Sequence, residues 1–131
     1  MRDFENELYS SLRDYVDSRH DGIFWTTVPE PIPVKLPTIS FELVDNPVDT
    51  EHIYDGKAEY TLPKFVVRAS VKDNDKAQAK ELLACCDEYL SSIGFSRSFG
   101  PAREGDAGVF SMYSIYDDNI VNSSNGRVYM R

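Results

Sequence analysis

The stretch "PKFVVRASVKDNDKAQAKELLACCDEYLSSIGF", residues 63–95, decides the fold because its hydrophobic period changes from 2 to 3.6. In its first part, Phe65, Val67, Ala69 and Val71 alternate with polar or smaller neighbours, which is typical of a strand with one buried face. In its second part, apolar side chains recur at helical intervals, and they are Ala79, Leu82, Leu83, Cys86, Leu90 and Ile93. We therefore expect a strand followed by a helix that packs on a sheet.

Both ends of this helix carry recognisable signals. Asp75 is a favourable N-cap residue, and Gln78 follows it by three residues, as in a capping box. Gly94 suits the left-handed position that commonly ends a helix. The helix is thus predicted to run from about residue 76 to about residue 93.

The N-terminal part of the chain predicts a second helix over residues 3–19. Its apolar stripe contains Phe4, Leu8, Leu12, Tyr15 and Val16. The segment "IFWTTVPEPIPVKLP", residues 23–37, then has too many prolines for a helix and lacks the PxxP ligand spacing, so we expect a stiff connector. Phe24 and Trp25 are expected to anchor this connector, either to the core or to a neighbouring subunit.

The remaining segments predict further strands. "PTISFELVDNP", residues 37–47, alternates like a half-buried strand, and "HIYDGKAEY", residues 52–60, predicts a hairpin around Asp55-Gly56. Residues 95–100, 108–117 and 126–131 are expected to be strands as well. The predicted fold class is α+β: a mainly antiparallel sheet with two helices on one face and a protruding β-hairpin, in a single domain over residues 1–131.

Composition narrows the class of protein. The chain has 131 residues and a formal net charge of −8, and an acidic balance opposes tight nucleic-acid binding. Its longest uncharged run is too short for a membrane helix, and the charged N-terminus does not resemble a signal peptide. Folding in a cytoplasm is expected. The adjacent Cys85 and Cys86 are predicted to be buried helix side chains rather than a disulfide.

A search for chemistry gives no catalytic residue, no metal site and no cofactor site. His20 and His52 lack partners at ligand spacing, and the loop "GPAREGDA", residues 100–107, lacks the Lys and Ser or Thr of a phosphate loop. "DNDKA", residues 73–77, lacks the other ligands of a calcium loop. A small enzyme or ligand-binding domain remains the alternative, with a site built from Asp117, Asp118, Arg97 and Arg103.

The predicted hairpin at 52–60 has few apolar side chains with which to cover its own core. Ordering such a segment costs conformational entropy, and packing against another chain would offset that cost. Tyr54, Tyr60, Phe24 and Trp25 suit this role because aromatic residues are enriched at interface cores. The alternative is a hairpin that stays in solvent.

The succession of elements between about residues 37 and 95 resembles small tail terminator proteins of long-tailed bacteriophages, also called tail completion or minor capsid proteins. The similar features are a strand ending in "DNP", a "YDG" hairpin before an aliphatic strand, and the helix onset "DNDKAQAKELL". An N-terminal helix and a short C-terminal segment, "GRVYMR", also fit.

The resemblance implies a structural virion protein without enzymatic activity or cofactor. Such proteins form a ring, typically a hexamer, that caps the major tail tube protein and joins the tail to the neck. The ring assembles in the host cytoplasm, and DNA passes through its lumen without specific binding. Residues expected at subunit or partner contacts are Phe24, Trp25, Tyr54, Asp55, Gly56, Lys57, Tyr60, Arg127 and Arg131. A head-tail connector or neck adaptor is the alternative within the same machine.

Overall fold

The computed structural model describes residues 4–27, 35–48, 60–106, 109–122 and 125–130, and for Gly105 and Asp106 it describes the backbone alone. Its two helices are α1 (Phe4–Asp17) and α2 (Lys76–Ser92). Its strands are β1 (Phe24–Thr26), β2 (Thr38–Asp45), β3 (Tyr60–Thr61), β4 (Lys64–Lys72), β5 (Phe99–Asp106), β6 (Val109–Tyr116), β7 (Asn119–Asn122) and β8 (Val128–Met130).

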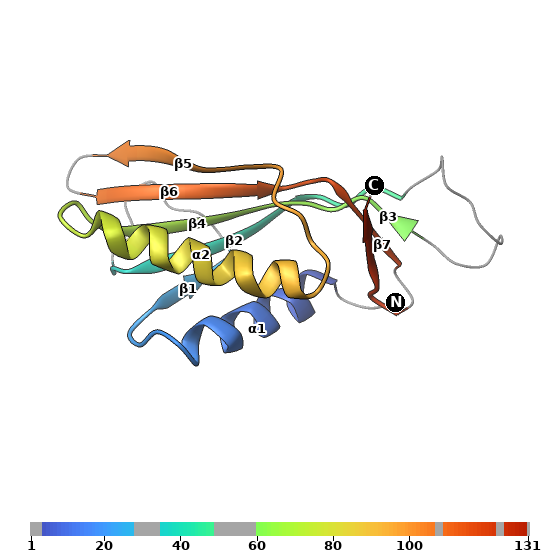
Figure 1. Cartoon of the computed structure of the whole chain (residues 1–131), viewed down its shortest axis with the longest axis horizontal. Coiled ribbons are helices and arrows are strands. Elements are labelled where there is room, and N and C mark those ends of the chain that lie inside the picture. The colour runs from blue at the N-terminus through green and yellow to red at the C-terminus, as the bar shows by residue number, and fades with distance from the viewer. Residues whose placement is uncertain (1–3, 28–34, 49–59, 107–108, 123–124, 131) are drawn as a thin grey trace.

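A five-stranded sheet with the order β1-β2-β4-β6-β5 forms the body of the molecule. β1 pairs with β2 in parallel, and the other neighbours are antiparallel. Both helices lie along the same face of this sheet (Figure 1). The α+β class and the mainly antiparallel sheet are therefore confirmed. The predicted hairpin at 52–60 falls outside the described residues except for Tyr60.

The core lies between the helices and this face of the sheet. Phe65, Val67, Ala69 and Val71 of β4 are all fully buried there, as their alternation predicts. The Phe65 ring stacks on Tyr116 of β6 at 5.0 Å between centroids. These side chains make β4 the central strand of the core.

The helix stripes are confirmed with one exception. In α1 the buried residues are Leu8, Leu12 and Val16, and Phe4 and Tyr15 pack against the core while partly exposed. In α2 the predicted stripe is buried from Ala79 to Leu90, whereas Ile93 is exposed. Ile93 is exposed because it is the C-cap residue, where the chain turns away from the helix axis.

The two ends of α2 differ in how well the sequence predicts them. At the C-terminal end, Phe95 N–H donates to Leu90 O (2.9 Å) and Gly94 N–H donates to Ser91 O (3.1 Å), which is the Schellman pattern. The capping box predicted at the N-terminal end is wrong. Asp75 has φ −113° and ψ 42° rather than extended angles, and its side chain makes no capping hydrogen bond. Its backbone carbonyl instead accepts from Gln78 N–H at 3.0 Å.

Residues 100–106, predicted as part of a loop, belong to strand β5, and the strand predicted at 95–100 begins only at Phe99. The sequence is misleading because a bulge between Phe99 and Ala102 requires glycine. Gly100 has φ +97°, and an added Cβ would meet Tyr113 O at 2.5 Å. Pro101 is tolerated because β5 is an edge strand in the described sheet.

The expectation of one sheet is incomplete, since a second sheet with the order β3-β7-β8 follows the first. It lies at the end of the body where β2 and β6 finish, and α2 ends nearby (Figure 1). A bridge between Val48 and Thr61 links the chain after β2 to β3. The predicted stiff connector also begins with a strand, β1, which the sequence pattern did not show.

Candidate subunit interface

The second sheet has two chemically different faces because its strands alternate in register. Val121 pairs with Thr61 on one side and with Val128 on the other, and Val121 and Thr61 are buried against the body. Ile120 pairs with Tyr129, so these two side chains share the opposite, outer face.

Tyr60 completes the outer face from β3. The rings of Tyr60 and Tyr129 lie 6.5 Å apart between centroids. Together with Ile120 and Met130 they line a hollow of about 270 Å³. Tyr129 is 44% exposed and Met130 is 66% exposed. We refer to Tyr60, Ile120, Tyr129 and Met130, which line this hollow, as the outer apolar patch. Ile120 is buried, and Met130 pairs with Asn119 and so belongs by register to the other face of the sheet.

One buried amide holds this sheet to the body. The Asn119 side chain accepts from Ser96 N–H at 2.9 Å through Oδ1. Its Nδ2 donates to Gly94 O at 3.1 Å and to Tyr129 O at 3.2 Å. Asn119 is almost fully buried, so these hydrogen bonds satisfy an amide that water cannot reach. The orientation of β8, and with it Tyr129, is therefore tied to the C-terminal end of α2.

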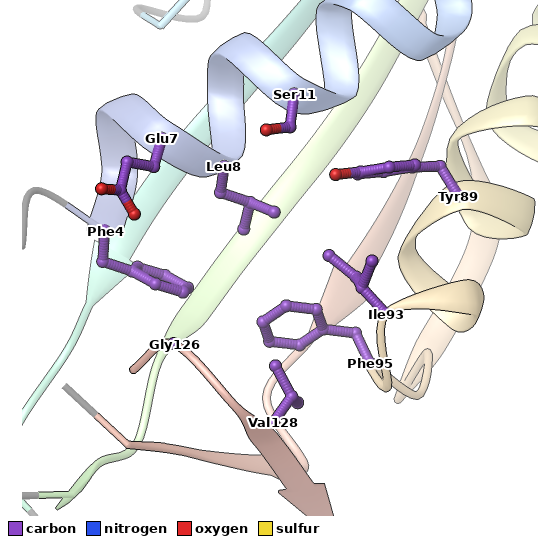
Figure 2. A pocket seen from close by; sticks show the side chains of 9 residues that line it. All are labelled: Phe4, Glu7, Leu8, Ser11, Tyr89, Ile93, Phe95, Gly126 and Val128. Carbon is purple, nitrogen blue, oxygen red and sulfur yellow. The ribbon is translucent and has the colours of Figure 1, made fainter. Parts of the chain in front are cut away.

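A second hollow, of about 200 Å³, lies between α1, the C-terminal end of α2 and the segment before β8. Its apolar lining comes from Phe4, Leu8, Ile93, Phe95 and Val128. Glu7, Ser11 and Tyr89 add polar groups, and the Tyr89 ring extends from α2 toward α1 (Figure 2). We call this hollow the helix-end groove.

The structure separates the predicted interface residues into two places. Phe24 pairs with Thr38 at the first residue of β2, whereas Tyr60 and Arg127 belong to the region of the second sheet, beyond the last residue of β2. Arg127 is exposed, as is much of Phe24. Tyr54, Asp55, Gly56, Lys57 and Arg131 lie outside the described residues.

Trp25 packs within its own chain. Its side chain packs on the core, its ring lies 6.2 Å from Tyr9, and its Nε1 donates to Asp17 Oδ1 at 2.8 Å. Of the two roles expected for this residue, anchoring the chain to the core is the one that these contacts support.

Sequence reasoning missed the exposed Tyr129 and Met130 and the buried Ile120 as residues of this patch. β7 spans four residues and β8 three, which is too short for an alternating pattern to stand out. The only available signal was the apolar content of "VYM" beside two arginines at the end of the chain.

The residues of the alternative enzyme site are not all brought to one place in the sheet. Arg97 Nη1 lies 4.0 Å from Asp87 Oδ2. Arg103 Cζ lies over the Phe110 ring, 5.3 Å from its centroid. In the sheet Arg103 is opposite Met112, whereas Asp117 follows the end of β6, where its N–H donates to Ser98 Oγ. Asp118 is exposed in the bend after it.

The titratable groups inside the body are held in their neutral forms. Burial raises the pKa of the Cys86 thiol, and also that of Cys85. Burial and the hydrogen bond that its hydroxyl donates to Asp87 Oδ1 (2.8 Å) raise the pKa of Tyr116. Protonated thiols are poor nucleophiles, so these groups act in packing.

The described residues contain no cluster of three or more His, Cys, Asp or Glu side chains that could hold a metal ion. Within the same part of the chain, no helix has the length and apolarity needed to cross a bilayer. No protein-family model matches this sequence, and no curated protein matches it.

Proposed function

We propose that this chain is a structural subunit that assembles into a ring on the end of a bacteriophage tail tube. The ring stops tube polymerisation and presents a surface to the neck proteins of the head. The observation that carries the proposal is the outer apolar patch, in which Tyr129 and Met130 are exposed and Tyr60 is half-buried at one end of the molecule.

The composition of the patch supports contact with protein. Tyr and Met are enriched at the cores of protein interfaces, and large apolar side chains gathered on one surface commonly mark binding sites. Tyr60 comes from β3, and Tyr129 and Met130 come from β8 of a small sheet that Asn119 holds in place. A partner would therefore meet a surface formed in advance, which lowers the entropy cost of binding.

The net charge of the chain supports a position around a DNA channel. At −8 per subunit, a ring of six copies repels phosphate strongly. Repulsion favours passage of DNA without adhesion, which a head-to-tail joint requires.

A tube-length assay tests this proposal. Tail tube protein of the same phage is polymerised with and without the purified chain, and tube lengths are measured by electron microscopy. We expect shorter tubes with extra density at one end. Tubes of unchanged length and bare ends would refute the proposal. Binding to a neck protein instead would identify an adaptor.

A further inference from the structure

The helix-end groove is lined mainly by apolar side chains and can therefore accept an apolar group. Phe4, Leu8 and Phe95 form its apolar lining together with Val128, and Ile93 stands exposed at its edge. Its volume of about 200 Å³ accommodates one large side chain of a partner. Glu7 places a carboxylate on the α1 side of the groove (Figure 2).

A side chain with complementary chemistry projects elsewhere on the same molecule. Phe24 is 42% exposed, and the Lys35 Nζ lies 5.1 Å from the centroid of its ring. Phe24 shares the face of Thr38, opposite to the face on which Ile39 and Trp25 pack under the helices. This surface thus offers an aromatic ring with an ammonium group beside it.

The two surfaces lie at different ends of the body. The groove is formed by the first turns of α1 and the last turn of α2. Phe24 begins β1, shortly after the end of α1 (Figure 1). A contact between unlike surfaces on the two ends of a subunit is heterologous, and it closes into a ring when the rotation between copies allows.

We propose that Phe24 of one copy enters the helix-end groove of the next copy, with Lys35 facing Glu7. This inference rests on the proposed ring and specifies its subunit contact. A charge of the other sign also lies close in sequence to each surface: Asp21 precedes Phe24 by three residues, and Arg127 directly follows Gly126. Lys35 opposite Glu7 and Asp21 opposite Arg127 would each bring unlike charges together, so the contact is complementary in charge.

Covalent trapping tests the contact. Asp21→Cys and Arg127→Cys, which leave Phe24 and the groove lining intact, are made singly and together, and each is treated with a short bis-maleimide crosslinker on tail tubes. Wild type is the control, because Cys85 and Cys86 are buried. We expect covalent multimers from the double variant. A mixture of the two single variants should give only dimers, because each copy then carries one new cysteine. Rings that form on tubes without any such crosslink would overturn the contact while leaving the proposed function intact.

Exchanging the charges of Lys35 and Glu7 tests the proposed contact independently of crosslinking. Lys35→Glu and Glu7→Lys are each expected to weaken ring formation on tubes by about fivefold, and the double exchange to restore most of it. Lys64→Glu, which changes an exposed lysine on β4, is the matched control and leaves assembly unchanged. Single exchanges without effect would contradict the pairing. If no ring forms on tubes with the wild-type chain, the proposed function fails and the contact fails with it.

Discussion

At the scale of single residues, a few positions explain how the second sheet and the edge strand are held. Asn119 connects three backbone groups from different parts of the chain, and Gly100 permits β5 to approach Tyr113 O. Asn119 is polar and Gly100 has no side chain, so hydrophobic patterning does not mark either position as important. Their importance follows from tertiary contacts that no local window of sequence contains.

Replacing Asn119 by Ala should destabilise the fold by about 2–3 kcal/mol, because buried backbone groups would lose their partner. The free energy of unfolding in urea measures this. Asn125→Ala is the matched control, since Asn125 is exposed and its Oδ1 accepts from Arg127 N–H at 2.8 Å. Equal losses in both variants would show that Asn119 does not hold the sheet.

Replacing Gly100 by Ala should cost more than replacing Gly22 by Ala. Both glycines have positive φ, +97° and +75°, so both variants carry the backbone strain of about 1–2 kcal/mol. Only at Gly100 would the new Cβ clash with backbone, at 2.5 Å from Tyr113 O, whereas Gly22 has nothing within 4 Å. Thermal unfolding of the two variants gives the comparison, and a larger loss at Gly22 would contradict the bulge geometry.

The raised pKa of Tyr116 predicts a loss of stability in alkali. The folded state keeps this phenol neutral, while the unfolded chain ionises near pH 10. Stability is therefore fully present below pH 10 and falls as pH rises above it, because the folded state then binds more protons than the unfolded chain. The free energy of unfolding measured between pH 9 and 11 should fall less steeply in Tyr116→Phe. An unchanged slope would refute this assignment.

At the scale of elements, hydrophobic periodicity predicted the parts that build the core. Two helices and the strands at β2, β4 and β6 are long enough for a period of 2 or 3.6 to be read. β1, β3, β7 and β8 have two to four residues each, and β5 contains Gly-Pro-Ala, so their pairing depends on neighbours that sequence does not reveal. The outer apolar patch was missed except for Tyr60 for the same reason, since all four of its residues lie on those short strands.

A substitution in the outer apolar patch should weaken assembly without much loss of folding stability. Tyr129→Ser should lower the free energy of unfolding by less than about 1 kcal/mol, because the ring is substantially exposed, yet weaken assembly on tubes about tenfold or more. Phe99→Ser is the matched control, since Phe99 is a similarly exposed aromatic residue on β5, outside the patch. Chemical denaturation measures the free energy of unfolding, and co-sedimentation with tail tubes measures assembly. A collapse of monomer stability in Tyr129→Ser would show that the patch belongs to the core.

At the scale of the whole molecule, the arrangement is a body with a continuous core and a small sheet at one end. The core cluster runs from α1 and α2 through β2, β4 and β6 and includes Val121 of the small sheet. The body thus supplies its own stability, and the surfaces left exposed are available for partners. The outer apolar patch and the helix-end groove both adjoin β8, so one short strand contributes to both.

The most direct measurement is native mass spectrometry of the chain released from the ends of tail tubes after crosslinking. A closed assembly of six copies is predicted, with the peptide containing Tyr129 protected from surface labelling. Recovery of monomers alone, with Tyr129 labelled as fully as in the free chain, would contradict the claim that another protein covers the patch.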